Sequence, residues 1–530
     1  EASPRYMQAL ADIDVKAKPN TYVFAENYVR DVLRNANRTD RALGKVRNLM
    51  YLKYIAGVPS TATLNLSQNL TTFAPYMGLY TKLAYPKTAI AMKDIVKEGG
   101  AYWDFIHGRK PAWKNLTDEE ARALDTMLGN GFFDAELTRE LIGIHLGSAG
   151  KVMNAFNTAM DFMFGNAEKY NRVSSGLMAF RVFRNEHKLS FEDAVAKAST
   201  AIDDTHYAYG KYNLPEIART GAAGRAFRST GYVFKQFVHN YFEMLYHLTK
   251  QPGGLKVIGK SVATMALLGG VVAMPFIGSG IALYRKLTGK DPIQELFKKV
   301  DKTKNIAYTL FRFGLPGLLG VDFSAPIAVQ LPGEYSRTIG EFATDVVLGP
   351  PGRILATELP SAYKQYMRGQ PMRALEEIAP RFAKQPMRTY REATEGITTA
   401  RGRPVSDVIT GKPIKLTWKE ALLKAGGYTP TRTTVQREIS SQLKRLEETR
   451  RNKLDELTTR YANAVKSKDK DEQKIILKEW HDYNKKARAL KEPIIDMKSW
   501  NAAVKSRQKP TKLPQYMQPT RREYMPGGKQ

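Results

Sequence analysis

The clearest chemical pattern in this sequence runs from Gly254 to Ser261, GLKVIGKS, and matches the P-loop pattern G-x-x-x-x-G-K-[ST]. In a P-loop the glycine-rich backbone offers N–H groups to phosphate, while the lysine and serine, here Lys260 and Ser261, serve the terminal phosphate and its magnesium ion. Such a loop joins a buried strand to a helix in an α/β domain. Here the preceding YFEMLYHLTKQP has a helical pattern, and no alternation of strands and helices surrounds it. A chance match is favoured, and a P-loop nucleotide hydrolase remains an alternative function.

A second candidate cluster is Asp203-Asp204-Thr205-His206, which places two carboxylates beside an imidazole. Adjacent side chains on a helix point about 100° apart, so these groups cannot converge on one metal ion from regular backbone. A hydrogen-bonding cluster before the loop YAYGKYNLP is the favoured interpretation. We therefore expect no catalytic residues, no metal ligands and no cofactor, and a protein that is not an enzyme.

The C-terminal part of the chain is strongly basic. From Arg381 to Gln530 there are 35 Lys or Arg against 17 Asp or Glu, a net +18. Apolar residues at near-heptad spacing, then a polar turn at 467–471 and a second apolar stripe, predict a long basic helical hairpin. Such a hairpin could grip nucleic acid through phosphates, the alternative being an ordinary charged helical surface. The candidate polyanion contacts are Lys444, Arg445, Arg450, Arg451, Lys485 and Lys486.

Composition gives the setting for these motifs. The chain has 530 residues, more than one core usually supports, with 82 Lys or Arg against 52 Asp or Glu. The net charge of +30 implies a polyanionic neighbour such as nucleic acid or an anionic membrane, and charge alone does not choose between them. Cysteine is absent, so the chain has no disulfides and suits both reducing and oxidising compartments.

An uncharged run of 24 residues, Ser261 to Tyr284, interrupts this polar sequence. As one helix it would be about 36 Å long, enough for a hydrocarbon core of roughly 30 Å. Five glycines and prolines within it make a kinked helix or a re-entrant hairpin an alternative to a straight span. A buried core helix is a further alternative. The candidate membrane-inserting residues are Leu267, Leu268, Val271, Val272, Phe276, Ile277 and Ile281. Its basic flank consists of Lys256, Lys260, Arg285 and Lys286.

The remaining sequence predicts a mainly α fold: an elongated multi-helix assembly with long irregular connections and the C-terminal basic hairpin. Helices are expected at 118–128, 135–146, 152–164 and 191–202, the first and last with N-capping signals at Thr117 and Ser190. Dense proline and glycine between 311 and 352 predicts extended chain that wraps a neighbour. The expected organisation is an N-terminal helical domain (1–250), the apolar, candidate membrane-inserting segment (251–290), a Pro/Gly-rich extended and helical region (291–430), the basic helical hairpin (431–507) and a flexible tail (508–530).

The order of several segments resembles the C-terminal region of the large polyvalent, PLxRFG-type polyproteins of tailed phages and prophages. The resemblance spans about residues 50 to 505, and each segment is weak alone. It rests on TLNLSQNL (63–70), AIDDTHYAYGKYNLP (201–215), FKQFVHN (234–240), the apolar run, GLPGLLGVDFS (314–324), LGPPG (348–352), EGITTARGRPV (395–405) and EALLKAGGYTPT (420–431). After GVDFS the family often continues into a basic residue and a glycine-rich turn, where this chain has APIAVQLPG.

The resemblance implies an internal virion or ejection protein. Such a protein is stored inside the capsid near the portal and the packaged DNA, and helps form the genome-delivery conduit in the host envelope after ejection. Its expected partners are further copies of itself, portal or other internal virion proteins, double-stranded DNA bound without sequence specificity, and the host membrane after ejection. Any catalysis would belong to other parts of a parent polyprotein. A purely structural core or portal-associated protein that never meets a membrane is the first alternative.

Overall fold

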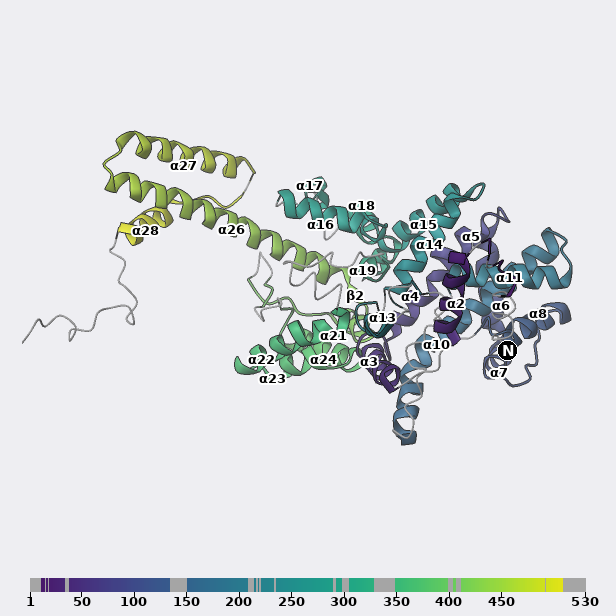
Figure 1. Cartoon of the computed structure of the whole chain (residues 1–530). Coiled ribbons are helices and arrows are strands. Elements are labelled where there is room, and N and C mark those ends of the chain that lie inside the picture. Colours follow the sequence, from purple (N-terminus) through teal and green to yellow (C-terminus); the bar gives the residue numbers. More distant parts are fainter. Residues whose placement is uncertain are drawn as a thin grey trace, which may run out of the picture. The chain divides into compact units, whose positions relative to one another are not determined.

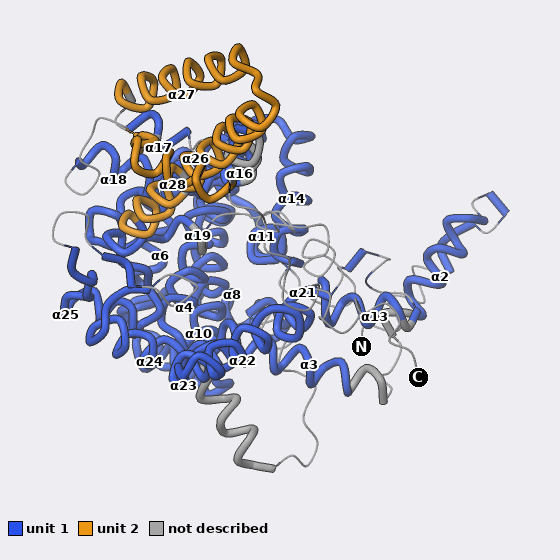
Figure 2. The backbone as a smooth tube through the Cα atoms, turned by 90° about the vertical axis from the view of Figure 1, so that its left-hand side faces the viewer, with its two compact units in different colours: residues 1–434 blue, residues 435–530 orange. Residues whose placement is uncertain are grey.

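The fold is mainly α-helical, as predicted, in a computed structural model shown in Figure 1. The structure describes residues 11–14, 16–17, 19–33, 38–133, 150–207, 214–215, 218, 221–232, 235–288, 292–297, 305–327, 348–398, 404–406, 411–490 and 492–508. The expected helix at 135–146 and the tail from 509 lie outside these residues. The chain forms two compact units, residues 1–434 (unit 1) and 435–530 (unit 2), coloured separately in Figure 2.

Unit 1 is built around one long helix, α10 (Gly150–Arg181), which packs on α4 (Pro59–Leu66), α6 (Ala84–Glu98), α8 (Asp118–Gly129) and α11 (Phe191–His206). The helix predicted at 152–164 is the first half of α10. Val173, Leu177 and Phe180 are buried in the main core. Among the described residues, the other helices before the apolar run are α2 (Pro19–Leu33), α3 (Arg38–Tyr54), η1 (Asn69–Phe73), α5 (Ala74–Met77), α7 (Gly100–Ile106), η2 (Val182–Glu186), α13 (Gly221–Ser229) and α14 (Gln236–Thr249).

The predicted N-terminal caps are present. Thr117 accepts a hydrogen bond from Glu120 N, and the Glu120 carboxylate accepts one from Thr117 N, which completes a capping box before α8. Ser190 accepts from Asp193 N before α11. Because each cap satisfies backbone donors at a helix start, these signals locate both starts to the residue.

The part of the second half of unit 1 that the structure describes forms short helices and one minimal sheet. The helices are α15 (Gly254–Gly269), η4 (Val271–Ala273), α16 (Ile277–Thr288), α17 (Pro292–Leu296), α18 (Ile306–Phe313), η5 (Leu315–Leu319), α19 (Ser324–Ile327), α21 (Gly349–Arg353), η7 (Ile354–Glu358), α22 (Leu359–Met367), α23 (Pro371–Ile378), α24 (Arg381–Thr394) and α25 (Trp418–Ala425). Strand β1 (Val321–Asp322) pairs antiparallel with β2 (Thr429–Pro430), with Val321 opposite Pro430.

The expectation of extended chain at 311–352 is wrong for most of the described part of that segment, where only the two residues of β1 form a strand. Residues 315–319 form a 3₁₀-helix and 349–353 an α-helix, both with a proline in the first turn. Proline has no N–H to contribute, and the first residues of a helix need none, so a proline-rich segment can start helices as readily as it forms extended chain.

Unit 2 contains most of α26 (Thr431–Lys466), together with α27 (Lys470–Leu490) and α28 (Met497–Gln508). α27 folds back beside α26 (Figure 1), and their apolar stripes meet in a core that includes Leu457 and Ile476. The predicted hairpin turn is present, with Lys468 at φ 58°. α28 adds Trp500 to this core, where its ring lies edge-on to Tyr461 and tilted against Trp480.

Candidate functional surfaces and buried polar centres

The residues that match the P-loop pattern (254–261) belong to a packed helix, α15. α15 begins at Gly254, so the motif's backbone folds as helix from its first residue and does not form a loop. A side chain at Gly254 would place its Cβ 1.7 Å from the carbonyl oxygen of Leu248, which explains the glycine by packing. Ser261 is buried and donates to the carbonyl of Thr71 at 2.5 Å. Its hydroxyl therefore serves the contact between α15 and η1.

The apolar run is broken in the middle. α15 ends at Gly269, the chain passes through Gly270 at φ 74° and Phe276 at φ 64°, and α16 begins at Ile277. Among the described residues, no helix combines the length and apolar character that a membrane span requires. The glycines and proline thus break the apolar run into two helices, as the alternative to a straight span predicted.

A close backbone crossing fixes this break. A Cβ on Gly270 would lie 2.3 Å from the carbonyl carbon and oxygen of Arg312, and a Cβ on Gly314 would lie 2.4 Å from the carbonyl oxygen of Leu267. Both glycines have positive φ, which other residues rarely adopt. The ends of α15 and α18 therefore meet backbone to backbone, and this contact explains Gly314, the first glycine of the GLPG segment.

The predicted membrane-inserting residues divide between surface and interior. Leu267, Phe276 and Ile277 are exposed, the first two by 55% each. Leu268, Val271 and Val272 are half-buried, and Ile281 is buried. Beside them η5, which contacts α15, exposes three further leucines, one of them, Leu319, by 81%. We call this exposed set the α15–η5 surface: Leu267, Phe276, Ile277, Leu315, Leu318 and Leu319.

The predicted basic flank has a mixed placement. Lys256 is exposed on α15, whereas Lys260 is half-buried, with its Nζ beside Gly78. The carbonyl of Lys260 accepts from Thr264 Oγ1 at 2.9 Å and from the Tyr85 hydroxyl at 3.4 Å. Arg285 and Lys286 both fall in α16.

The Asp203–His206 cluster is part of a buried hydrogen-bond network, as the favoured interpretation predicts. Ser175 Oγ lies 2.8 Å from His206 Nε2 and donates to Asn69 Oδ1 at 3.0 Å. Asn69 Nδ2 donates in turn to Ser174 Oγ at 3.0 Å. Gln68 and Thr72 both donate to the carbonyl of Thr205. Polar residues of the segments TLNLSQNL (63–70) and AIDDTH (201–206) thus form hydrogen bonds with each other and with residues of α10.

A buried arginine closes this network. Arg172 is fully buried and donates to the carbonyls of His206 and Tyr207 at 3.3 and 2.7 Å, with Glu168 at 3.6 Å. Burial, assisted by this cation, holds the pKa of His206 well below its usual value, so the imidazole is neutral. Burial also raises the pKa of Asp204, whose carboxylate accepts from the Tyr76 hydroxyl at 2.6 Å. Within the described ranges, no His, Cys, Asp and Glu side chains gather as a metal site would require.

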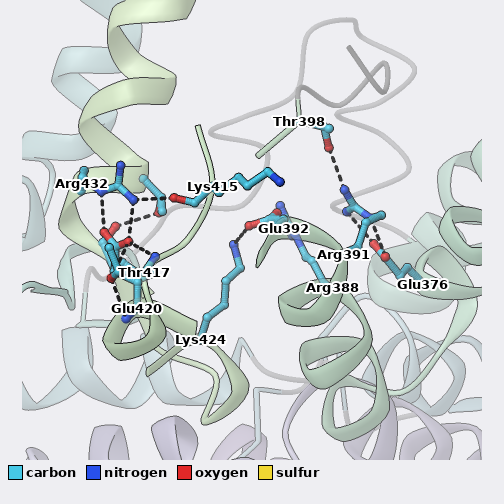
Figure 3. Close-up of polar contacts among 12 residues, drawn as sticks. Glu376, Arg388, Arg391, Glu392, Thr398, Lys415, Thr417, Glu420, Lys424 and Arg432 are labelled. Carbon is cyan, nitrogen blue, oxygen red and sulfur yellow. Dashed lines mark hydrogen bonds and ion pairs between the residues drawn. The ribbon is translucent and has the colours of Figure 1, made fainter. Parts of the chain in front are cut away.

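A second polar centre, which the sequence pattern did not reveal, joins α23, α24 and α25 (Figure 3). Arg391 is buried and binds Glu376 through two parallel hydrogen bonds of 2.7 and 2.8 Å. The neighbouring Glu392 is fully buried between Arg388, at 2.8 Å, and the ammonium of Lys424. Although burial alone would raise the pKa of Glu392, the two cations outweigh it and hold that pKa below its usual value.

A third ion pair stands at the start of α25. Glu420 caps Thr417 N at 2.8 Å and also accepts two hydrogen bonds from Arg432, at 2.7 and 2.6 Å (Figure 3). Gly427, at φ 84°, lies where a Cβ would be 2.2 Å from Val58 Cγ1. The Tyr428 hydroxyl lies 2.7 Å from Thr63 Oγ1. Through these contacts the EALLKAGGYTPT segment (420–431) connects α4, α25 and the start of α26.

Unit 2 carries the predicted polyanion contacts. Lys444, Arg451, Lys485 and Lys486 are exposed; of these, Lys444 lies 3.6 Å from Glu448, while Arg450 is half-buried and pairs with Glu447. Arg445 falls in α26. Arg460 binds both Glu472 and Glu479 of α27, at 2.7 and 3.0 Å, and so ties the hairpin together. The predicted residues thus combine locally neutralised cations with exposed ones.

No family model, curated protein or solved structure that we compared with this chain matches it.

Proposed function

We propose that this chain is an internal virion protein of a tailed phage that takes part in genome delivery. The proposal starts from the segment order described above and from the net charge of +30. In this role the protein is stored in the capsid near the portal and other internal proteins, associates with further copies, lies against packaged DNA without reading its sequence, and contacts the host membrane after release.

The observation that carries the membrane part of the proposal is the α15–η5 surface. It gathers exposed side chains from both halves of the broken apolar run and from GLPGLLG, two segments on which the resemblance rests. Each Leu or Phe side chain left in water lacks the stabilisation that burial would give, about 25 cal/mol per Å² of apolar area. A partner that covers this surface, whether lipid or protein, recovers that free energy.

The purely structural alternative has its own support. Met265 and Ala273 of the run belong to the main core of unit 1, and Ser261 donates a hydrogen bond to the Thr71 carbonyl in η1. The buried side of the run therefore holds the folded unit together. A protein that uses this segment only for packing would show the same burial.

Vesicle flotation separates the two functions. Deleting residues 261–284 would remove part of the core, so the test variant changes exposed positions only: Leu267→Gln, Phe276→Asn and Leu319→Gln. Asparagine suits position 276 because it tolerates positive φ. The matched control changes three exposed apolar residues elsewhere in unit 1: Leu83→Gln, Val96→Gln and Leu422→Gln.

We expect the wild type and the control to float with anionic vesicles even at high salt, and the test variant to lose the salt-resistant fraction. If the wild type fails to float, the membrane part of the proposal is wrong and the structural function is favoured. If the wild type floats and the test variant floats like the control, the α15–η5 surface is not what binds the membrane. Circular dichroism of each variant checks that the fold is intact.

A further inference from the structure

A second apolar surface follows η7, α22 and α23. Leu355 and Leu359 begin a stripe that continues through Tyr363, Tyr366 and Met367, and the last three are exposed by 64 to 65%. The spacing of four, four and then three or four residues places them on one helical face. α23, which packs on α22, adds exposed Met372 and Leu375. We call these seven residues the α22–α23 surface.

The opposite side of these helices is anchored in the unit. Ala362, Gln365 and Ala374 are buried. Lys53 Nζ donates to the carbonyl of Ile378 at 2.9 Å and pairs with Glu358 at 2.9 Å. The helices therefore already have a packed side, and the tyrosine and methionine stripe is the side that faces out.

Charge on this surface has one sign. The three acidic residues between 353 and 378 have internal partners: Glu358 binds Lys53 and Tyr54, Glu376 binds Arg391, and Glu377 lies 3.7 Å from Lys384. The exposed charged side chains of the same stretch are all basic: Arg353, Lys364 and Arg368.

We propose that the α22–α23 surface binds anionic lipid headgroups, with α22 lying in the plane of the membrane interface. Leucine and methionine enter the acyl boundary, tyrosine lies at headgroup level, and the basic residues pair with lipid phosphates. This inference rests on the proposed function only in that both bring the protein to a membrane, since the residues involved are separate from the α15–η5 surface.

Two other partners fit less well. A second copy docked symmetrically would bring Arg353, Lys364 and Arg368 toward their own equivalents, with no exposed acid in this stretch to pair them. Duplex DNA would satisfy the basic residues but would leave Leu355, Met367 and Leu375 in water. An anionic bilayer satisfies both the apolar and the basic groups.

The absence of cysteine allows a direct test. Tyr366→Cys gives a single thiol for an environment-sensitive dye, and Leu422→Cys, at an exposed position of α25, gives the control. With vesicles of phosphatidylglycerol and phosphatidylcholine, the dye at 366 should brighten severalfold and shift to the blue, and the dye at 422 should not. Phosphatidylcholine alone should give a much weaker response. A response at 366 that depends on protein concentration without vesicles would mean self-association and would overturn the inference.

Substitutions test the same surface without a label. Tyr363→Ser, Tyr366→Ser and Met367→Gln together should lower vesicle partitioning at least tenfold, while Lys364→Gln and Arg368→Gln should each lower it about fivefold at low salt. Flotation of wild type without a dye response at 366 refutes this inference and leaves the proposed function standing. A dye response in the Leu267, Phe276 and Leu319 variant, with flotation undiminished, supports this surface and refutes the role of the α15–η5 surface.

Discussion

Arg391 and Glu376 form a two-pronged ion pair inside unit 1, with Nε donating to Oε1 at 2.7 Å and Nη2 to Oε2 at 2.8 Å. Both residues are buried, and Arg391 Nη1 also donates to Thr398 Oγ1 at 3.1 Å. The pair connects α23 to α24 and to the segment that follows α24. Because two charges hidden from water depend on each other, either one alone is costly.

Removing the arginine should therefore destabilise unit 1 strongly. We expect Arg391→Ala to lower the free energy of unfolding by about 3–5 kcal/mol, since it leaves Glu376 buried without its partner. Arg450→Ala, which breaks a pair on the surface of unit 2, should cost about 1 kcal/mol or less. Urea unfolding measures both. Equal effects would mean that the Arg391 pair is not buried as described.

Lowering the pH should reduce the stability of the same region of unit 1. The pKa of Glu392 is lowered in the folded protein, so the unfolded chain takes up the proton first as the pH falls. The stabilisation is fully present above the ordinary glutamate pKa of about 4.3 and is lost as the pH drops through the folded value. Glu392→Gln should reduce the slope of unfolding free energy against pH in this range. An unchanged slope would contradict the ion-pair assignment.

The close backbone contact at Gly314 can be tested with a matched pair of glycine substitutions. Gly314 and Gly320 have similar φ, 69° and 79°, but a Cβ meets the Leu267 carbonyl at 2.4 Å only at Gly314, whereas nothing lies within 4 Å at Gly320. Gly320→Ala should cost about 1–2 kcal/mol for the left-handed backbone alone. Gly314→Ala should cost clearly more, because α15 and α18 must separate. Thermal unfolding of the two variants compares them.

DNA binding should depend on unit 2. Replacing Arg451, Lys485 and Lys486 by glutamine should weaken binding to duplex DNA of any sequence. The slope of log K against log salt should become shallower by up to about 0.9 for each DNA phosphate that the variant no longer neutralises. The control removes three exposed lysines from unit 1, Lys82, Lys93 and Lys97. If both variants lose the same affinity, binding follows total charge and not the hairpin.

The sequence predicts those features that depend on neighbouring residues. The caps at Thr117 and Ser190, the mainly helical fold and the hairpin turn all follow from local spacing. The interruption of the apolar run was one of the predicted forms, because Gly270 and Pro275 make it locally. The glycines at 269, 270 and 314 were informative, but the sequence did not show which backbone they approach.

Long-range polar pairs could not be predicted in this way. Glu376 and Arg391 are 15 residues apart, and Glu392 and Lys424 are 32 apart, at spacings that belong to no helix or strand period. Each of these side chains looks like an ordinary surface charge in the sequence. The α22–α23 surface could not be predicted from the sequence either, because tyrosine and methionine at helical spacing usually indicate a helix face buried in the core.

The contacts of α3 bear on when unit 1 can fold. Lys53 donates to the carbonyl of Ile378, 325 residues further along, and Tyr54 accepts from Arg381, 327 residues along. A ribosome adding about 5–20 residues per second needs roughly 15–65 s to deliver the second partner after the first. During that interval the part of α3 that meets α21 and α24 lacks its partner. Unit 1 is therefore expected to close late in synthesis, and chaperone demand should rise with any pause before residue 430.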